Sequence, residues 1–264
     1  MSQRFELYLA GDSWLHRLDP RSKLWAVLLA AAVGLLFKSI VVLAGLLLLA
    51  HLALLAARLP ARTIGRLWLR LLPLLVMILV LQPLFAPGGA ELLRLGPLRF
   101  TQDGLLDGAS FALRMAALAF AAAVLLVTTE SAALVQGLVK LGLPYPWGLT
   151  VDLAIRYLPT TYGLFLTMHE AQQARGWIVD RGNVFRRARA YVPILVATII
   201  AALRLSDHLG LALAARGLGY PARRTALRDV HFARGDWLAL GFVTLAFGGL
   251  LALRYGLGFG AAPW

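Results

Sequence analysis

Five long apolar runs constrain what this chain can fold into. They cover residues 24–37, 40–57, 71–86, 105–127 and 237–253. Runs of this length are typical of helices that cross a lipid bilayer. The whole chain is 60% hydrophobic, whereas soluble domains usually contain about 45–50% apolar residues. The sequence therefore predicts an all-α integral membrane protein with about five transmembrane helices.

The basic residues follow a membrane topology. The formal net charge is +13, which on a soluble protein would suggest a nucleic-acid partner. With the N-terminus placed inside the cell, the inner segments 1–23, 58–70 and 128–236 hold 4, 4 and 13 of the 26 Lys and Arg residues. Basic residues concentrate on the cytoplasmic side of membrane proteins. We therefore predict a multi-pass protein of the cell (inner) membrane, with a cytoplasmic N-terminus, an outer C-terminus and no nucleic-acid partner.

The first apolar run has a clear helix start. Asp19 can cap the helix and Pro20 suits its first position. We expect Arg21 and Lys23 to anchor its cytoplasmic end at the lipid headgroups. The acidic residues before the run are a poor match to the basic start of a signal peptide, so we interpret the run as the first span.

Arginines recur before the third apolar run. Arg58, Arg62, Arg66 and Arg70 are four residues apart, so a helix would place them on one face. Such a stripe is typical of contact with lipid headgroups, and contact with a partner protein is the alternative. The run that follows contains Pro73 and Pro83, which predict kinks.

The fourth apolar run carries alanines at helical spacing. A seam of small residues lets helix backbones approach closely in lipid. We therefore expect helix packing here, within the chain or with a second membrane subunit. The seam consists of Ala109, Ala112, Ala116, Ala119 and Ala123.

The segment 128–236 is helical in character but too polar to span a bilayer comfortably. Its prolines, at positions 144, 146, 159, 193 and 221, predict a short helix near 131–142, a long helix near 148–175 bent at Pro159, and another near 193–216. The pairs Asp152–Arg156 and Arg204–Asp207 have the spacing of stabilising ion pairs on a helix. The sequence thus predicts three parts, which are a membrane region at 1–127, a cytoplasmic helical region at 128–236, and a last transmembrane helix with the C-terminus at 237–264.

The two long cytoplasmic helices end alike. One closes with Ala174-Arg175-Gly176 and the other with Ala215-Arg216-Gly217. Arginine in a last turn followed by glycine is ordinary helix capping. The repetition at the ends of two long helices also fits docking to another protein, and the residues alone leave both interpretations open.

Five segments in order resemble one known family, the transmembrane coupling (T) component of energy-coupling factor transporters. Residues 16–24 (His-Arg-Leu-Asp-Pro-Arg-Ser-Lys-Leu) resemble the start of its first span. Residues 128–138 resemble the stretch after its fourth span, with Glu130-Ser131 where the family often has Asn-Pro. Residues 155–159 (Ile-Arg-Tyr-Leu-Pro), 171–176 (Ala-Gln-Gln-Ala-Arg-Gly) and 214–217 (Ala-Ala-Arg-Gly) are similar to its helix-bend segment and its two Ala-Arg-Gly signatures.

The resemblance implies a non-catalytic subunit that joins two ABC-type ATPases to a small substrate-binding (S) membrane subunit. The two long helices would cross on the cytoplasmic side, and Arg175 and Arg216 would each enter a groove of one ATPase. This chain would bind no cofactor, with ATP and Mg on the ATPases. The cargo would be a vitamin, a vitamin precursor or a transition-metal ion. Residues implied to support the coupling helices are Arg156, Pro159, Glu170, Arg204 and Asp207.

No phosphate-binding G-x-x-x-x-G-K-[ST] sequence is present, so an ATP-driven role needs another polypeptide. Three other classes of membrane protein remain as alternatives. A secondary transporter usually has carboxylates in mid-membrane. The predicted spans contain one carboxylate, Asp107, which we expect to pair with Arg114. They also contain one histidine, His51, near the end of the second span. A lipid-modifying membrane enzyme is suggested only faintly by Asp107-Gly108. The permease of a conventional ABC importer would carry one Glu-Ala-Ala…Gly loop, imitated by residues 170–176, but not two Ala-Arg-Gly ends.

The topology leads to a labelling prediction, made simple by the absence of cysteine. With single cysteines at Ser2, Asn183 and Ala262, an impermeant thiol reagent applied to intact cells should label only the one at Ala262. Permeabilised cells serve as the control, in which all three should react. Labelling at Asn183 in intact cells, without labelling at Ala262, would contradict the topology.

Overall fold

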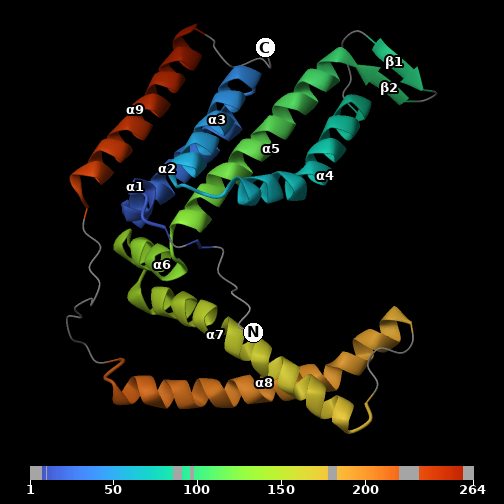
Figure 1. Cartoon of the computed structure of the whole chain (residues 1–264), viewed down its shortest axis with the longest axis vertical. Coiled ribbons are helices and arrows are strands. Elements are labelled where there is room, and N and C mark those ends of the chain that lie inside the picture. Colours follow the sequence, from blue (N-terminus) through green and yellow to red (C-terminus); the bar gives the residue numbers. More distant parts are fainter. Residues whose placement is uncertain are drawn as a thin grey trace. The chain divides into compact units, whose positions relative to one another are not determined.

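A computed structural model describes residues 8–9, 11–85, 91–95, 98–177, 183–219 and 232–257. Ser2, Ala86, Pro221 and Ala262, to which the sequence analysis gave roles, lie outside them. The helices are, in order, α1 (Trp14–Arg17), α2 (Pro20–Leu36), α3 (Ile40–Ala56), α4 (Ala61–Phe85), α5 (Gln102–Thr128), α6 (Ser131–Lys140), α7 (Tyr145–Ala174), α8 (Val184–Ala215) and α9 (Arg234–Leu257). This confirms the predicted all-α membrane class (Figure 1).

One small hairpin was not predicted. The strands β1 (Glu91–Leu95) and β2 (Leu98–Thr101) pair antiparallel between α4 and α5. The chain divides into two compact units, of which one contains α7 and α8 and the other contains α1 to α6, the hairpin and α9. The short helix α6, which the sequence analysis grouped with the long cytoplasmic helices, thus belongs to the larger unit.

Among the described residues, four helices are long and apolar enough to cross a membrane by length and composition. They cover Ala61–Leu84, Gln102–Thr128, Arg187–Ala215 and Arg234–Gly256, and α3 is a shorter apolar helix. The range Arg187–Ala215 lies in α8, which the sequence analysis placed in the cytoplasm. Hydropathy alone therefore does not separate α8 from the spans, and its contacts are described below.

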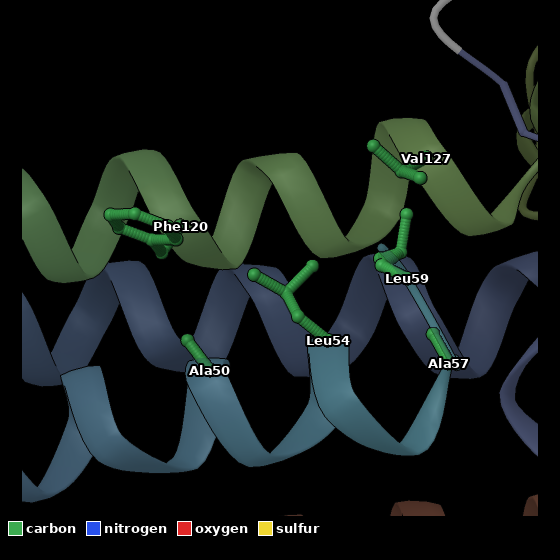
Figure 2. Close-up of a cluster of buried hydrophobic side chains, with 6 residues drawn as sticks. All are labelled: Ala50, Leu54, Ala57, Leu59, Phe120 and Val127. Carbon is green, nitrogen blue, oxygen red and sulfur yellow. The ribbon is translucent and has the colours of Figure 1, made fainter. Parts of the chain in front are cut away.

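The hydrophobic core of the larger unit lies between α3, the first half of α4, and α5. Its buried residues are Ala50, Leu54, Ala57, Leu59, Phe120 and Val127. Figure 2 shows Leu54 of α3 directed toward Phe120 and Val127 on α5. Leu54 and Phe120 are fully buried, so this contact fixes the C-terminal end of α3 against the C-terminal half of α5.

The arginine stripe is one residue shorter than predicted. Helix α3 ends at Ala56, and Arg58 has a positive φ of 57° in the connection to α4. Pro60 then precedes α4, so the helix that carries the remaining arginines begins at Ala61. Only Arg62, Arg66 and Arg70 share a helix. Figure 1 shows the predicted bend in α4, whose first half lies at a steep angle to α5 and whose second half runs alongside it.

Helix α5 packs through its small residues. Ala112, Ala116 and Ala123 are buried, while Ala109 and Ala119 are partly exposed. Helices α4 and α5 approach closely at Gly108, where an added Cβ would lie 3.1 Å from Cβ of Gln82 in α4. The alanine seam therefore serves packing within this chain, because α5 lies against α2, α3 and α4.

The start of α2 confirms one expectation and corrects another. Asp19 caps the helix by accepting a hydrogen bond from the Arg21 N–H at 2.9 Å, and Pro20 is the first helical residue. Lys23 is not a headgroup anchor, because it is buried. Its Nζ donates to the Thr128 carbonyl at 3.0 Å and to Thr129 Oγ1 at 3.1 Å. Lys23 thus satisfies one carbonyl and one hydroxyl oxygen at the C-terminal end of α5, where a helix dipole favours a cation.

Asp236 joins this polar cluster from the far end of the sequence. One carboxylate oxygen accepts from the Asp19 N–H at 2.7 Å and from Ser22 Oγ at 3.2 Å. The other accepts from the Ala233 N–H at 2.9 Å. Asp236 is 1% exposed. The cluster formed by Asp19, Ser22, Lys23, Thr128, Thr129 and Asp236, here called the polar junction, ties the N-termini of α2 and α9 to the C-terminus of α5.

The polar junction makes Asp236 a sensitive position. Asp236→Ala leaves the N–H groups of Asp19 and Ala233 without their acceptor, while the Ser22 hydroxyl keeps the Asp19 carbonyl at 2.7 Å. We therefore expect it to lower the free energy of unfolding by about 3 kcal/mol. Thermal or SDS unfolding of the purified protein in detergent measures the change. Asp12→Ala, at an exposed carboxylate, is the matched control, and an equal effect of the two changes would contradict the junction.

Candidate functional site

The two Ala-Arg-Gly ends lie in the unit formed by α7 and α8. Helix α7 is continuous through Pro159. Helix α8 begins nine residues earlier than predicted, and Pro193 lies inside it. The reason is local, because the Asn183 side chain accepts from the Val184 N–H at 2.8 Å and starts the helix there. A proline removes one hydrogen bond and bends a helix without necessarily ending it.

Aromatic stacking joins the two helices where they cross (Figure 1). The rings of Phe165 and His169 on α7 and of Tyr191 on α8 form a triangle, with centroids 6.2 Å (Phe165–His169), 6.0 Å (His169–Tyr191) and 6.5 Å (Phe165–Tyr191) apart. The three rings are nearly parallel, with interplanar angles of 25° and 13° at His169. Offset stacking of this kind adds to the burial of apolar area. His169 is therefore part of the joint between α7 and α8, which the sequence did not indicate.

The two Ala-Arg-Gly ends have the same backbone geometry. Arg175 and Arg216 are the C-caps, and the following glycines have φ of +80° and +79°. At the first end Gly176 N donates to the Gln173 carbonyl at 2.9 Å and Trp177 N to the Gln172 carbonyl at 3.0 Å. These two hydrogen bonds define a Schellman motif.

The second end repeats this pattern. Gly217 N donates to the Ala214 carbonyl at 2.9 Å, and Leu218 N donates to the Leu213 carbonyl at 2.9 Å. An added Cβ at either glycine would meet no atom within 4 Å. Glycine is therefore required for its positive φ, which other residues adopt only with strain.

Both arginines are presented to the outside. Ala174, Arg175 and Gly176 are exposed, as are Ala215, Arg216 and Gly217. Neither guanidinium group forms an ion pair or a side-chain hydrogen bond with another of the described residues. Each end is thus a rigid turn carrying a guanidinium fork that is free to pair with a carboxylate or with backbone carbonyls outside the chain. We call the residues 174–176 and 215–217 the first and second arginine tips.

Comparison with known proteins identifies the relatives of this chain. The family model described as cobalt transport protein (CbiQ) matches residues 11–226. The energy-coupling factor transporter transmembrane protein EcfT of Lacticaseibacillus paracasei is 32% identical over 262 residues, covering 94% of this chain and 97% of its own length. The EcfT proteins of Heliobacterium modesticaldum and Acidaminococcus fermentans are each 32% identical, covering 93% and 95% of this chain and 94% and 96% of their own lengths.

The chain belongs to the family of transmembrane (T) components of energy-coupling factor transporters. It is therefore a multi-pass membrane protein and a transport component. The resemblance drawn from five short segments is confirmed over nearly the whole chain.

The five residues that the resemblance implied to support the coupling helices lie on exposed surface. Arg156, Pro159, Glu170, Arg204 and Asp207 are all exposed. The predicted pairs Asp152–Arg156 and Arg204–Asp207 are not formed, because the only ion pair within the described ranges joins Arg21 and Asp19. At exposed positions an ion pair contributes little, since water screens the charges and both side chains lose rotamer entropy. The aromatic stack carries the contact instead.

The polar groups that suggested other functions have partners inside this T component. His51 Nδ1 donates to the Leu47 carbonyl at 2.9 Å, and its Nε2 accepts from Trp68 Nε1 at 3.0 Å. Arg114 does not pair with Asp107, but donates to the Phe37 carbonyl at 3.0 Å. These contacts give His51 and Arg114 structural roles.

Trp177 is a residue that the sequence analysis missed. It follows the first arginine tip directly, and its Nε1 donates to the Ala190 carbonyl of α8 at 3.0 Å. This bond connects the first tip to the opposite helix. The signal available in the sequence was an aromatic residue after Ala-Arg-Gly, whereas the second tip is followed by Leu218, which has no side-chain donor.

The Trp177 bond leads to a prediction about the first tip. Trp177→Phe keeps an aromatic ring but removes the N–H donor, so the amide protons of residues 172–177 should exchange with solvent about fivefold faster, the equivalent of one hydrogen bond of ~1 kcal/mol. Hydrogen exchange of the purified protein measures this. Trp147→Phe, an exposed tryptophan at the start of α7, is the control, and equal exchange in parent and Trp177→Phe would contradict the connection.

Proposed function

We propose that this T component couples ATP hydrolysis on two ABC-type ATPase subunits to a separate, small substrate-binding (S) membrane subunit. The cargo class is a vitamin, a vitamin precursor or a transition-metal ion. The observation that carries the proposal is the pair of arginine tips. One sequence builds the same Schellman turn twice, and each time it leaves an arginine exposed at a helix end without a partner among the described residues.

The number of tips fits the number of ATPases. ABC-type ATPases work in pairs, and each needs a contact through which its movement reaches the membrane part. Arg175 and Arg216 provide two such contacts, one at the end of each helix of the α7–α8 unit. A guanidinium group remains charged when it is desolvated and binds carboxylates or carbonyl groups through a planar fork. Arginine is accordingly common among the residues that dominate binding energy at interfaces.

ATP and Mg are assigned to the partner subunits in this proposal. The sequence contains no Gly-Lys dipeptide, and so no phosphate-binding loop of the usual kind. No group of three or more His, Cys, Asp or Glu side chains is placed to hold a metal ion in the part of the chain that the structure describes. In this proposal the chain is a non-catalytic subunit that transmits movement.

The α7–α8 unit is assigned to the cytoplasmic side. The range Arg187–Ala215 is apolar enough to span a bilayer, but α8 also exposes Arg204, Asp207 and His208 in its second half. Charged side chains exposed at mid-helix are costly in hydrocarbon. Apolar residues on the same helix suit contact with the membrane surface or with the S subunit. The labelling at Asn183 proposed above tests this placement.

The arginine tips give the central prediction. Arg175→Ala and Arg216→Ala should each weaken ATPase copurification and substrate uptake together, and the double change should abolish uptake. If the arginines only cap their helices, each contributes ~0.3–1 kcal/mol. If they are buried in ATPase grooves, each contributes ~2 kcal/mol or more, which is about 30-fold in affinity. The affinity of each variant for its ATPases, measured after purification of the complex, separates the two cases.

Two control variants sharpen this experiment. Arg17→Ala removes an exposed arginine of α1, in the other compact unit, and should retain the ATPases. Arg175→Lys and Arg216→Lys keep the charge but lose the planar fork, and should restore binding poorly. If both alanine variants hold their ATPases and transport at the parental rate, the tips are helix caps only.

A further inference from the structure

The first half of α4 has two faces of opposite character. Ile64, Leu67, Trp68 and Leu71 pack against the hydrophobic core of the larger unit. At about 100° per residue, Arg62, Arg66 and Arg70 lie on the opposite side of the same helix. All three arginines are exposed. This set of three, here called the α4 arginine stripe, therefore points away from the protein core.

The α4 arginine stripe has no acidic partner. The sequence contains no Asp or Glu between Asp19 and Glu91. No ion pair within the described ranges includes an arginine of the stripe. Arg66 makes only local contacts, to the Arg62 carbonyl at 3.3 Å and to Thr63 Oγ1 at 3.4 Å. Three positive charges within nine residues thus repel one another and attract an anion from outside the chain.

The stripe lies near side chains that are typical of the membrane–water interface. The core beneath it includes Val127, next to Thr128 of the polar junction. At that junction the exposed Trp14 approaches Gly235, whose added Cβ would lie 3.5 Å from Trp14 Nε1, and Trp237 is 64% exposed. Exposed tryptophans are typical of the membrane–water interface. The first half of α4 begins beside the C-terminal half of α5 and lies at a steep angle to it (Figure 1).

We propose that the α4 arginine stripe binds the phosphate groups of anionic phospholipids. Guanidinium groups pair with phosphate oxygens through two hydrogen bonds, which gives the stripe a preference for phosphate-bearing anions. Leu69, on the same face, is 70% exposed and can enter the acyl region below the headgroups. A charged face with interleaved apolar residues is the pattern of a helix that lies in the plane of the interface.

Continuity with a lipid-facing surface favours lipid over a protein partner. The second half of α4 exposes Leu74, Val76 and Met77, and only 6% of the most apolar window of α4 is buried. One helix therefore presents guanidinium groups first and an exposed hydrocarbon surface next, with a bend between them. A phospholipid has the same order of charged headgroup and hydrocarbon chain. This inference rests on membrane insertion and not on the docking of ATPases.

Lipid retention by the purified full chain tests the inference. In detergent containing equal amounts of phosphatidylglycerol and phosphatidylcholine, native mass spectrometry should show preferential retention of phosphatidylglycerol. The triple change Arg62→Gln, Arg66→Gln and Arg70→Gln should weaken this retention at least about tenfold, since each basic residue near an anionic surface strengthens binding roughly fivefold at low salt. The corresponding triple lysine variant should retain most of the binding.

A charge-matched control decides between a specific stripe and net charge. Arg187→Gln, Arg189→Gln and Arg204→Gln remove the same charge from α8 and should leave phosphatidylglycerol bound. An equal loss in both triple variants overturns the proposal. Retention of phosphatidylglycerol at the parental level in the α4 triple variant also overturns the proposal. If that variant instead loses a copurifying membrane subunit, the stripe is a protein contact.

A second measurement does not depend on folding of the glutamine variant. A single cysteine at Leu69, in a chain that has no other, carries a fluorophore next to the stripe. Headgroup-labelled, quenching phosphatidylglycerol should reduce its emission more than the same label on phosphatidylcholine, and salt should remove the difference. Equal quenching by the two lipids at low salt overturns the proposal.

Discussion

The larger unit depends on the polar junction at one end of its helices. Asp19 and Asp236 lie at the N-termini of α2 and α9, and Lys23 lies against the C-terminal carbonyl of α5. Each charge therefore faces the helix end whose dipole favours it. In an apolar environment the unpaired N–H and C=O groups of helix ends are costly. The junction satisfies them across 217 residues of sequence, and so fixes which helix ends meet.

The two arginine tips show how a local rule can serve a global arrangement. Glycine after the C-cap is a common way to end a helix, and both tips obey that rule. What the rule does not supply is a fixed direction in space, because a helix end can move with its helix. The packing of Phe165 and His169 against Tyr191 and the hydrogen bond from Trp177 to α8 supply it for the first tip. The second tip shares the turn but not the tryptophan, so the two contacts are mechanically different.

The sequence predicted what depends on neighbouring residues and missed what depends on distant ones. The Asp19 cap, the start of α6 at Ser131 and the two glycine turns follow from local chemistry. The start of α8 was misplaced because Pro193 was given more weight than the Asn183 cap. The partners of Lys23 could not be predicted from its neighbours, because Lys23 and Thr128 are 105 residues apart in the sequence. The coupling region was likewise expected to use ion pairs, whereas the structure uses stacked rings.

Counting basic residues predicts which side of the membrane is the inner one but does not say what each residue does. Burial and partners separate at least four roles. Lys23 is buried at the end of α5, and Arg114 donates to the Phe37 carbonyl at the end of α2. The tip arginines and the α4 stripe are both exposed without acidic partners, yet their backbones differ. A single arginine on a rigid turn suits a shaped protein groove, while three arginines along a helix above an apolar surface suit a plane of phosphates. The arrangement of the backbone around an exposed arginine, more than its charge, therefore determines which kind of partner it can bind.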